Sequence, residues 1–249
     1  QMGRVKIGKP LNSNTYGWDN EYGQLEVQVA PFEATQYLIT NAEYLQFFNA
    51  GAYNDRQYWT QEGWEWKTTE GQQQPKFWIV DGDSFQYRAM FDNIPLPLDW
   101  PVEVNAHEAW AYCNWKGEGW RLLSEAEFNL IGHQELEEGD CIFSDDYNLN
   151  LLYGSPTPVG YMKEGDKHGG FYDLFGNVWE WLKDDFYPLP GYKIHPLYED
   201  FSAPYFDTEH SMLAGSAWAT SGTGASKYYR LWFRRHFYQH AGFRIARAV

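Results

Sequence analysis

The sequence predicts a loop-rich α+β domain that forms one unit over residues 1–249. Aromatic residues make up 19% of the chain, which indicates a packed core and not a disordered segment. The 23 glycines and 12 prolines indicate many turns between short elements, because both residue types interrupt regular structure. No repeat or low-complexity linker divides the sequence, so one continuous domain is expected.

The elements can be placed in order along the chain. Apolar and polar residues alternate over Gln24–Ala30, which is typical of a half-buried strand. Thr40, Asn105 and Ser124 each stand three residues before a glutamate, a reciprocal capping pattern that satisfies free N–H groups at a helix start. Apolar residues at helical spacing follow these caps, and Gly117 is expected to end the second helix.

The last third of the chain is expected to contain a long loop and two strands. Little is periodic over Tyr187–Gly215, and its prolines forbid a long helix, so this segment is interpreted as a loop. Leu231–Arg235 and Gly242–Ala246 are interpreted as strands joined by a tighter segment.

That joining segment contains two histidines, His236 and His240. On a helix this spacing would place both rings near one ion. In an extended chain the two residues lie about 13 Å apart, too far for a shared metal. Shared chelation is therefore disfavoured, and two roles stay open, namely structural hydrogen bonding and contact with a substrate.

Charge and hydropathy exclude two classes of partner. The formal net charge of −15 argues against nucleic acid and against anionic membranes, because both require a basic surface. No apolar run approaches the roughly 18 residues that span a bilayer. We expect a soluble, cytoplasmic protein. Cys113 and Cys141 are too few for a disulfide framework and are expected to be reduced, buried thiols.

Four separated motifs resemble one family. The stretches "DWPVEVNAHEAWAYCNW" with "RLLSEAEF", "GGFYDLFGNVWEW", "AGSAWATSG" and the terminal "GFR" are similar, in order and spacing, to formylglycine-generating enzyme/sulfatase-modifying-factor domains. The resemblance implies a C-type-lectin-like α+β fold. Within the superfamily, "NSNTYGWDNEYG", "IHPLYEDFSAPYFD" and "FRRHFYQHAGFR" look most like ovothiol-synthesis sulfoxide synthases, relatives of the ergothioneine-synthesis enzymes.

The superfamily has two chemistries, and the residues favour one. Formylglycine-generating enzymes carry two copper-binding cysteines where this chain reads "WATSGTGASKYYR", so that copper activity is not expected. The sulfoxide synthases use non-haem iron(II) and oxygen to join a cysteine-type thiol to a histidine-type imidazole. Their iron ligands come from an N-terminal helical domain, which these 249 residues do not contain. Iron is therefore expected only through a missing domain or a partner chain.

The resemblance implies a substrate pocket near the end of the chain. Arg230, Arg234 and Arg235 are placed in it by likeness, because a guanidinium binds the carboxylate of an amino acid; ion pairs within the protein are the alternative. Tyr187 is the expected proton donor in the "YPLPGY" loop, with packing as its alternative. The remaining expected substrate contacts are Tyr192, Trp218, His236 and His240.

The resemblance also implies a calcium site in "DLFGNVWEW". The carried-over ligands are Asp173, Glu180 and the carbonyls of Gly176 and Val178, and such hard oxygen ligands suit calcium. The alternative is a structural turn. For the chain as a whole, the sequence predicts the substrate-binding domain of an ovothiol-type sulfoxide synthase that is not competent alone. The second hypothesis is a non-catalytic binding or structural module with the same fold.

Overall fold

The computed structural model describes residues 2–132, 136–139, 141–142, 144–163 and 168–249, and it has the loop-rich α+β fold that the sequence predicts. None of the helices in these segments is long and apolar enough to cross a membrane. The α-helices are α1 (Asn41–Asn49), α2 (Gln61–Glu70), α3 (Ala106–Lys116) and α4 (Glu125–Gly132). Short 3-10 helices are η1 (Asp19–Glu21), η2 (Ala52–Asn54), η3 (Arg56–Tyr58), η5 (Ala203–Tyr205) and η6 (Gly222–Ala225).

The strands form several small sheets and no single large one. The central sheet has the order β10-β9-β8-β11, made of β10 (Leu231–Arg234), β9 (His210–Ala214), β8 (Trp179–Asp185) and β11 (Ala241–Gly242). The other sheets are β1 (Gly3–Ile7) with β2 (Leu25–Val29), β3 (Phe32–Ala34) with β12 (Ile245–Ala248) and β7 (Arg121–Leu122), and β4 (Trp78–Asp81) with β5 (Ser84–Arg88) and β6 (Asn93–Pro95).

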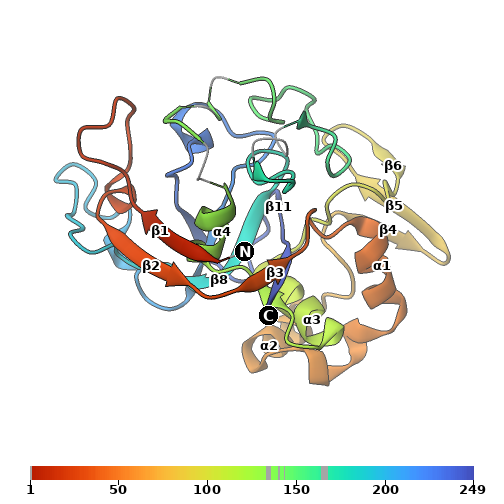
Figure 1. The fold of residues 1–249 in the computed structure, drawn as a ribbon. Coiled ribbons are helices and arrows are strands. Elements are labelled where there is room, and N and C mark those ends of the chain that lie inside the picture. The colour runs from red at the N-terminus through yellow and green to blue at the C-terminus, as the bar shows by residue number, and fades with distance from the viewer. Residues whose placement is uncertain (1, 133–135, 140, 143, 164–167) are drawn as a thin grey trace.

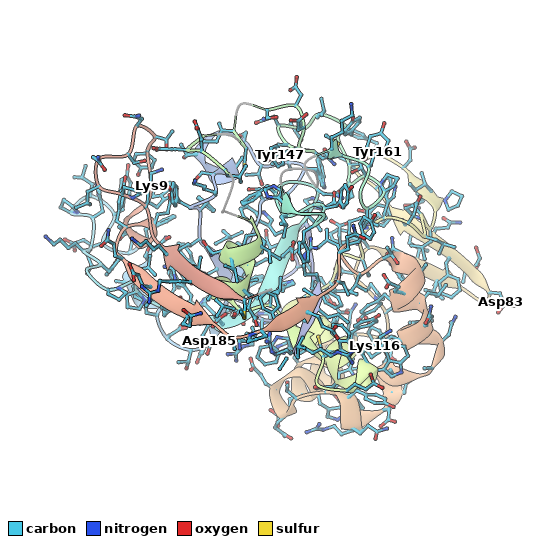
Figure 2. The ribbon with its side chains drawn as sticks, in the orientation of Figure 1. Lys9, Asp83, Lys116, Tyr147, Tyr161 and Asp185 are labelled. Atoms are coloured by element: carbon cyan, nitrogen blue, oxygen red, sulfur yellow. The ribbon has the colours of Figure 1, made fainter. Side chains whose placement is uncertain are left out.

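These sheets surround the central strands on several sides. Figure 1 shows β8 and β11 in the middle of the molecule, the β1–β2 sheet at the left and the β4–β5–β6 sheet at the upper right. Helices α1, α2 and α3 gather at the lower right of the same view. The hairpin of β4 and β5 projects from the body, with Asp83 at its tip (Figure 2).

The capping patterns of the sequence form real helix starts. The Thr40 hydroxyl accepts from the backbone N–H of Glu43 at 3.2 Å, and the Glu43 carboxylate accepts from the backbone N–H of Thr40 at 2.9 Å. Asn105 and Ser124 form the same reciprocal bonds at the starts of α3 and α4. Gly117 follows α3 with a positive φ of 68°, as its position predicts. The three predicted caps are therefore confirmed. They could be recognised from the sequence because the two residues of each cap lie within one helical turn.

Helix α2 is an element that the sequence analysis did not identify. Thr60 caps its start by accepting from the backbone N–H of Gly63, and Gly71 ends it in the left-handed region with φ 65°. The capping threonine and the terminal glycine were legible signals. The helix was still not predicted, because Gly63 lies inside it and its sequence has no apolar stripe.

Strand β9 corrects part of the predicted loop Tyr187–Gly215. The proline-rich part of that segment is irregular, but His210–Ala214 forms a fully buried strand between β8 and β10. Because β9 is covered on both faces, its residues do not alternate between apolar and polar types. A short strand of this kind carries little signal in the sequence.

The final segment is also divided differently from the prediction. Strand β10 ends at Arg234, and the predicted strand Gly242–Ala246 is split between β11 and β12. At Gly242 a Cβ atom would lie 2.7 Å from the carbonyl oxygen of Val102, so only glycine permits this close approach. The split turns the chain from the central sheet to the sheet of β3 and β7.

The aromatic residues of the sequence fill the interior. One cluster of buried side chains surrounds α1 and α3, where Tyr44 stacks on Tyr112 with ring centroids 5.6 Å apart. A second cluster lies between α4, the β1–β2 sheet and the central sheet, and includes Phe128 and Phe175. Cys113 and Cys141 are both buried and neither is in a disulfide, which agrees with the prediction.

The N-cap of α1 gives a direct test of the fold. Thr40→Ala removes the side-chain acceptor of the first turn and is expected to lower the free energy of unfolding by about 1 kcal/mol. Thr40→Ser is the matched control, because it keeps the hydroxyl and is expected to retain most of that stability. Urea unfolding of the three proteins measures the effect, and equal losses in both variants would contradict the cap.

Candidate functional site

A cleft of about 570 Å³ opens beside β10 and is called the β10 cleft here. Its walls come from the loop before β9, from the start of β9 and from β10 with its flanking residues. The aromatic wall residues are Phe201, Tyr205, Tyr229, Trp232, Phe233 and Phe237. The polar ones are Asp200, His210 and Arg234. Aromatic walls with a few polar groups are typical of small-molecule sites.

Arg234 and His210 stand directly opposite each other in this cleft. They are paired in the antiparallel register of β10 and β9, where opposite Cβ atoms lie about 5 Å apart. Arg234 is exposed, and its Nη1 donates to Oε2 of Glu209 at 2.5 Å. An exposed pair of this kind contributes little to stability. Arg234 can therefore exchange Glu209 for the carboxylate of a ligand at little cost.

His210 is a site residue that the sequence analysis missed. Its Nδ1 lies 2.8 and 2.9 Å from the two carboxylate oxygens of Asp207, which fixes the tautomer with the proton on Nδ1. Burial tends to raise the pKa of Asp207, but its hydrogen bonds to His210 and to the backbone N–H of Glu209, together with the charge of His210, lower that pKa. With the proton on Nδ1, Nε2 is the ring nitrogen of His210 that carries a lone pair. The spacing of Asp207 and His210 did not mark them as a site, because both lie in the segment that was interpreted as a loop.

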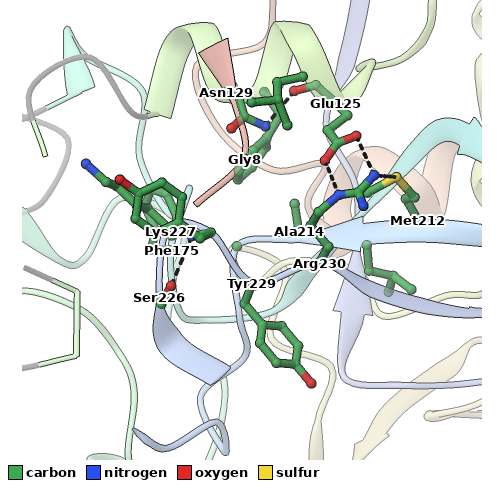
Figure 3. A pocket seen from close by; sticks show the side chains of 15 residues that line it. Gly8, Glu125, Asn129, Phe175, Met212, Ala214, Ser226, Lys227, Tyr229 and Arg230 are labelled. Atoms are coloured by element: carbon green, nitrogen blue, oxygen red, sulfur yellow. Dashed lines mark hydrogen bonds and ion pairs between the residues drawn. The ribbon is translucent and has the colours of Figure 1, made fainter. Parts of the chain in front are cut away.

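Arg230 has a structural role, the alternative that the sequence left open. Its Nε donates to Oε1 of Glu125 at 2.6 Å and its Nη2 to Oε2 at 3.1 Å, while Nη1 donates to the carbonyl of Asn20 at 2.9 Å. Figure 3 shows this pair between α4 and the segment that leads into β10. Arg230 and Glu125 are both buried, so breaking their pair to bind a substrate would leave a buried charge unpaired.

Arg235 is likewise committed to partners inside the protein. Its Nη2 donates to Oδ1 of Asp185 and to the carbonyl of Thr208, both at 2.7 Å, and its Nη1 donates to Oε2 of Glu62 at 2.7 Å. Asp185, labelled in Figure 2, is the last residue of β8. Arg235 thus links α2 to the central sheet, and it does not line the β10 cleft.

The two predicted loop tyrosines lie outside the β10 cleft. Tyr187 packs 4.9 Å from the guanidinium of Arg230, and burial together with the charge of Glu125 raises the pKa of its phenol. Tyr192 donates to Oδ2 of Asp19 at 2.8 Å, and burial with that hydrogen bond raises its pKa. Both phenols therefore keep their protons, and both are used in packing the loop.

His236 and His240 lie in different surroundings. His236 is exposed and stacks on Phe237 with ring centroids 4.9 Å apart. The Nδ1 of His240 lies 2.7 Å from Oε1 of Glu103. Within the described segments, no group of three or more His, Cys, Asp or Glu residues could hold a metal ion.

His240 and the predicted contact Trp218 line a second, smaller cavity of about 160 Å³, called the His240 pocket here. Their ring centroids are 4.7 Å apart, and Phe77 stacks on His240 from the end of the segment that precedes β4. Burial alone would lower the pKa of His240, but the hydrogen bond and the negative charge of Glu103 together outweigh burial and raise that pKa. The sequence therefore named residues of two separate cavities as one pocket.

Comparison with known proteins assigns this chain to a family. The family described as the sulfatase-modifying factor enzyme 1-like domain matches residues 1–249. The chain belongs to this family. The match confirms the family resemblance that the motifs carry.

Relatives of this sulfatase-modifying-factor domain include proteins named hercynine oxygenase and ergothioneine biosynthesis protein 1. A hercynine oxygenase from Mycobacterium tuberculosis is 30% identical over 242 residues, covering 92% of this chain and 55% of that protein. Ergothioneine biosynthesis protein 1 from Schizosaccharomyces pombe is 25% identical over 233 residues, covering 93% of this chain and 26% of that protein. The chain spans about half the length of this hercynine oxygenase.

A solved structure supports the fold of the family domain. The structure of PvdO from Pseudomonas aeruginosa aligns with 100% of this chain and 92% of that chain, with a TM-score of 0.67 and 17% identity. At that identity the likeness concerns the fold alone.

In the "DLFGNVWEW" turn, the cation beside Glu180 is the guanidinium of Arg244. Both carboxylate oxygens of Glu180 accept from Arg244, with Nε–O distances of 3.0 and 2.9 Å. Asp173 accepts from the backbone N–H of Gly160 at 2.7 Å and from the side chain of Asn177 at 3.0 Å. Glu180 is therefore not an open calcium ligand, since an ion would have to displace Arg244. Calcium at Asp173, Gly176, Val178 and Glu180 stays a prediction.

The raised pKa of His240 predicts how its pair with Glu103 depends on pH. A histidine whose folded pKa lies above its unfolded value stabilises the fold fully below the unfolded pKa of about 6.5, and loses that contribution as pH rises through the folded pKa. The stability difference between the native protein and His240→Gln is thus expected to be largest in acid and to shrink toward alkaline pH. Urea unfolding across pH measures it.

His236→Gln is the matched control for this titration, because His236 has no carboxylate partner among the described residues. It is expected to leave the pH dependence unchanged. A His240→Gln difference that grows with rising pH would contradict the pairing.

Proposed function

We propose that this domain provides the substrate cleft of a non-haem-iron sulfoxide synthase. Two facts support the proposal, namely membership of the sulfatase-modifying-factor family and 30% identity to a protein named hercynine oxygenase. The substrates would be a cysteine-type thiol and a histidine-type imidazole. In the overall reaction the thiol S–H and an imidazole C–H lose their hydrogens, which leave with one atom of O₂ as water, while the other oxygen becomes the sulfoxide.

Iron would come from residues outside this chain. Among the described residues no group of three or more His, Cys, Asp or Glu could hold a metal ion, and the proposal therefore places the iron ligands outside them. When bound by another domain or a partner chain, iron(II) would supply oxygen activation. The contribution of the domain itself would be to bind and orient the two organic substrates.

The observation that carries the proposal is the β10 cleft with Arg234 at its edge. Among the three arginines that the sequence assigned to substrate, Arg230 and Arg235 are held by internal carboxylates. Among the residues that the structure describes, Arg234 has only the exposed Glu209 as an ion-pair partner, so it would bind the substrate carboxylate. The aromatic walls would cover the flat imidazole ring of the second substrate.

His210 would serve as a proton acceptor in the same cleft. Asp207 holds the proton on Nδ1, which leaves Nε2 to take the proton of the substrate thiol. A thiolate is the reactive form of a thiol. This assignment replaces Tyr187, whose phenol packs against Arg230 outside the cleft.

The finer assignment to the ovothiol branch is part of the proposal. It rests on three stretches of sequence, residues 12–23, 194–207 and 233–244, of which the second and third contribute lining residues to the β10 cleft. Free histidine would then be preferred over hercynine, its trimethylated form. A preference for hercynine would contradict the ovothiol assignment, while sulfoxide synthesis itself would remain supported.

Arg234→Gln tests the cleft at the level of binding. The change removes the proposed carboxylate partner and is expected to weaken cysteine binding about tenfold, the loss of one charge-assisted hydrogen bond. Calorimetric titration measures it, with Arg4→Gln as the control because Arg4 is an exposed arginine of β1. Equal affinity in native protein and Arg234→Gln would contradict the role of Arg234.

Activity is tested on the full-length protein loaded with iron(II). Incubation with cysteine, histidine and oxygen is expected to yield a sulfoxide of the joined product by mass spectrometry. His210→Gln is expected to lower the rate and to change its pH profile more than the affinity for substrate. Absence of product with any tested thiol and imidazole would favour the second hypothesis, a non-catalytic binding module.

A further inference from the structure

The His240 pocket is a second cavity that shares no lining residue with the β10 cleft. One wall comes from β5 and the residues that follow it, another from Gly154–Pro156, and the base from Trp218 and His240. Its volume of about 160 Å³ is close to that of engineered cavities, about 150 Å³, that hold one benzene ring. The cavity is therefore large enough for a ligand with a single ring.

A buried carboxylate fixes the histidine of this pocket. Glu103 has a fully buried side chain, and its two oxygens accept from the Tyr87 hydroxyl and from Nδ1 of His240. The bond holds a proton on Nδ1 and leaves Nε2 without a partner among the described residues. The hydrogen bond and the charge of Glu103 favour the charged ring and raise the pKa of His240, and in the charged form Nε2–H can donate to an acceptor.

Trp218 supplies a second polar group that lacks a partner. It lines the pocket, it is 2% exposed, and its indole Nε1 is buried with no hydrogen-bond acceptor among the described residues. Buried donors are almost always paired in folded proteins, so an unpaired one marks a place where an acceptor is expected. The ring of Trp218 also lies against His240.

The rest of the lining is one cation and several apolar surfaces. Arg88 is exposed at the pocket, and among the described residues its guanidinium is bonded through Nη2 alone, which donates to the carbonyl of Lys76 at 3.1 Å. Phe77, Tyr87 and Pro156 provide apolar or aromatic wall. A guanidinium and an imidazole beside aromatic walls suit a flat ring that carries an anionic group.

We propose that the His240 pocket is a binding site for a small aromatic carboxylate, in which the carboxylate contacts His240 and Arg88 and the ring packs against Phe77 and Trp218. The buried Glu103 serves as a positioning residue that holds the imidazole ring of His240 in place. The site is independent of the proposed sulfoxide chemistry, because it uses none of the residues of the β10 cleft.

Benzoate is the probe, and benzamide is its neutral counterpart of the same shape. NMR titration of the native chain follows the indole N–H signals, with that of Trp218 assigned by its loss in Trp218→Phe. Benzoate is expected to shift this signal with a dissociation constant below about 10 mM, and benzamide is expected to bind about tenfold more weakly. No benzoate binding up to about 10 mM, or equal affinity for benzamide, would overturn the proposal.

Two variants test which side chains bind the carboxylate of benzoate. His240→Gln and Arg88→Gln are each expected to weaken benzoate binding about tenfold, and Arg88 is exposed, so its change does not threaten the fold. His236→Gln is the control, since that exposed ring stacks on Phe237 outside the pocket. Unchanged affinity in both pocket variants, or an equal loss in the control, would place benzoate elsewhere and contradict the site.

Discussion

The ion pair of Arg244 with Glu180 is the interaction on which the arrangement of this domain depends. All the guanidinium N–H groups of Arg244 are used. Nε and Nη2 donate to Glu180, Nη1 donates to the carbonyls of Thr35 and Gln36, and Nη2 also donates to the carbonyl of Tyr172. Both charged side chains are essentially inaccessible to solvent. Segments far apart in sequence therefore meet at one buried cation.

This contact positions the cavities through the strands on either side. Glu180 belongs to β8, which pairs with β9 and β11, while Arg244 stands between β11 and β12. Strand β9 then sets His210 opposite Arg234 of β10. Strand β11 begins one residue after His240, so the same frame orients the His240 pocket. Two cavities with different chemistry thus share one scaffold of short strands.

Sequence patterns that involve neighbouring residues predicted the helix starts. Contacts between residues far apart in the chain have no such pattern and were not predicted. The caps at Thr40, Asn105 and Ser124 depend on residues one turn away, and all three formed as expected. The arginines near the end of the chain look alike in sequence. Their roles differ because Arg230 meets Glu125 and Arg235 meets Glu62, partners more than 100 residues away that no local pattern reveals.

The cavities show the same limit. His210 was overlooked because β9 is buried on both faces and has no alternating pattern. His240 and Trp218 were predicted to contact a small molecule together with Arg234, yet they line a pocket apart from it. A family resemblance supplies candidate residues, and only the three-dimensional packing decides which of them lie together.

A double-mutant cycle on Arg244 and Glu180 tests this view of the domain most directly. Urea unfolding of Arg244→Met, Glu180→Met and the double variant measures how strongly the two side chains depend on each other. Each single change is expected to cost about 3–5 kcal/mol, because it leaves one buried charge unpaired, and the double variant is expected to cost less than the sum. Single losses below about 1 kcal/mol, or strict additivity, would show that the pair does not hold the frame.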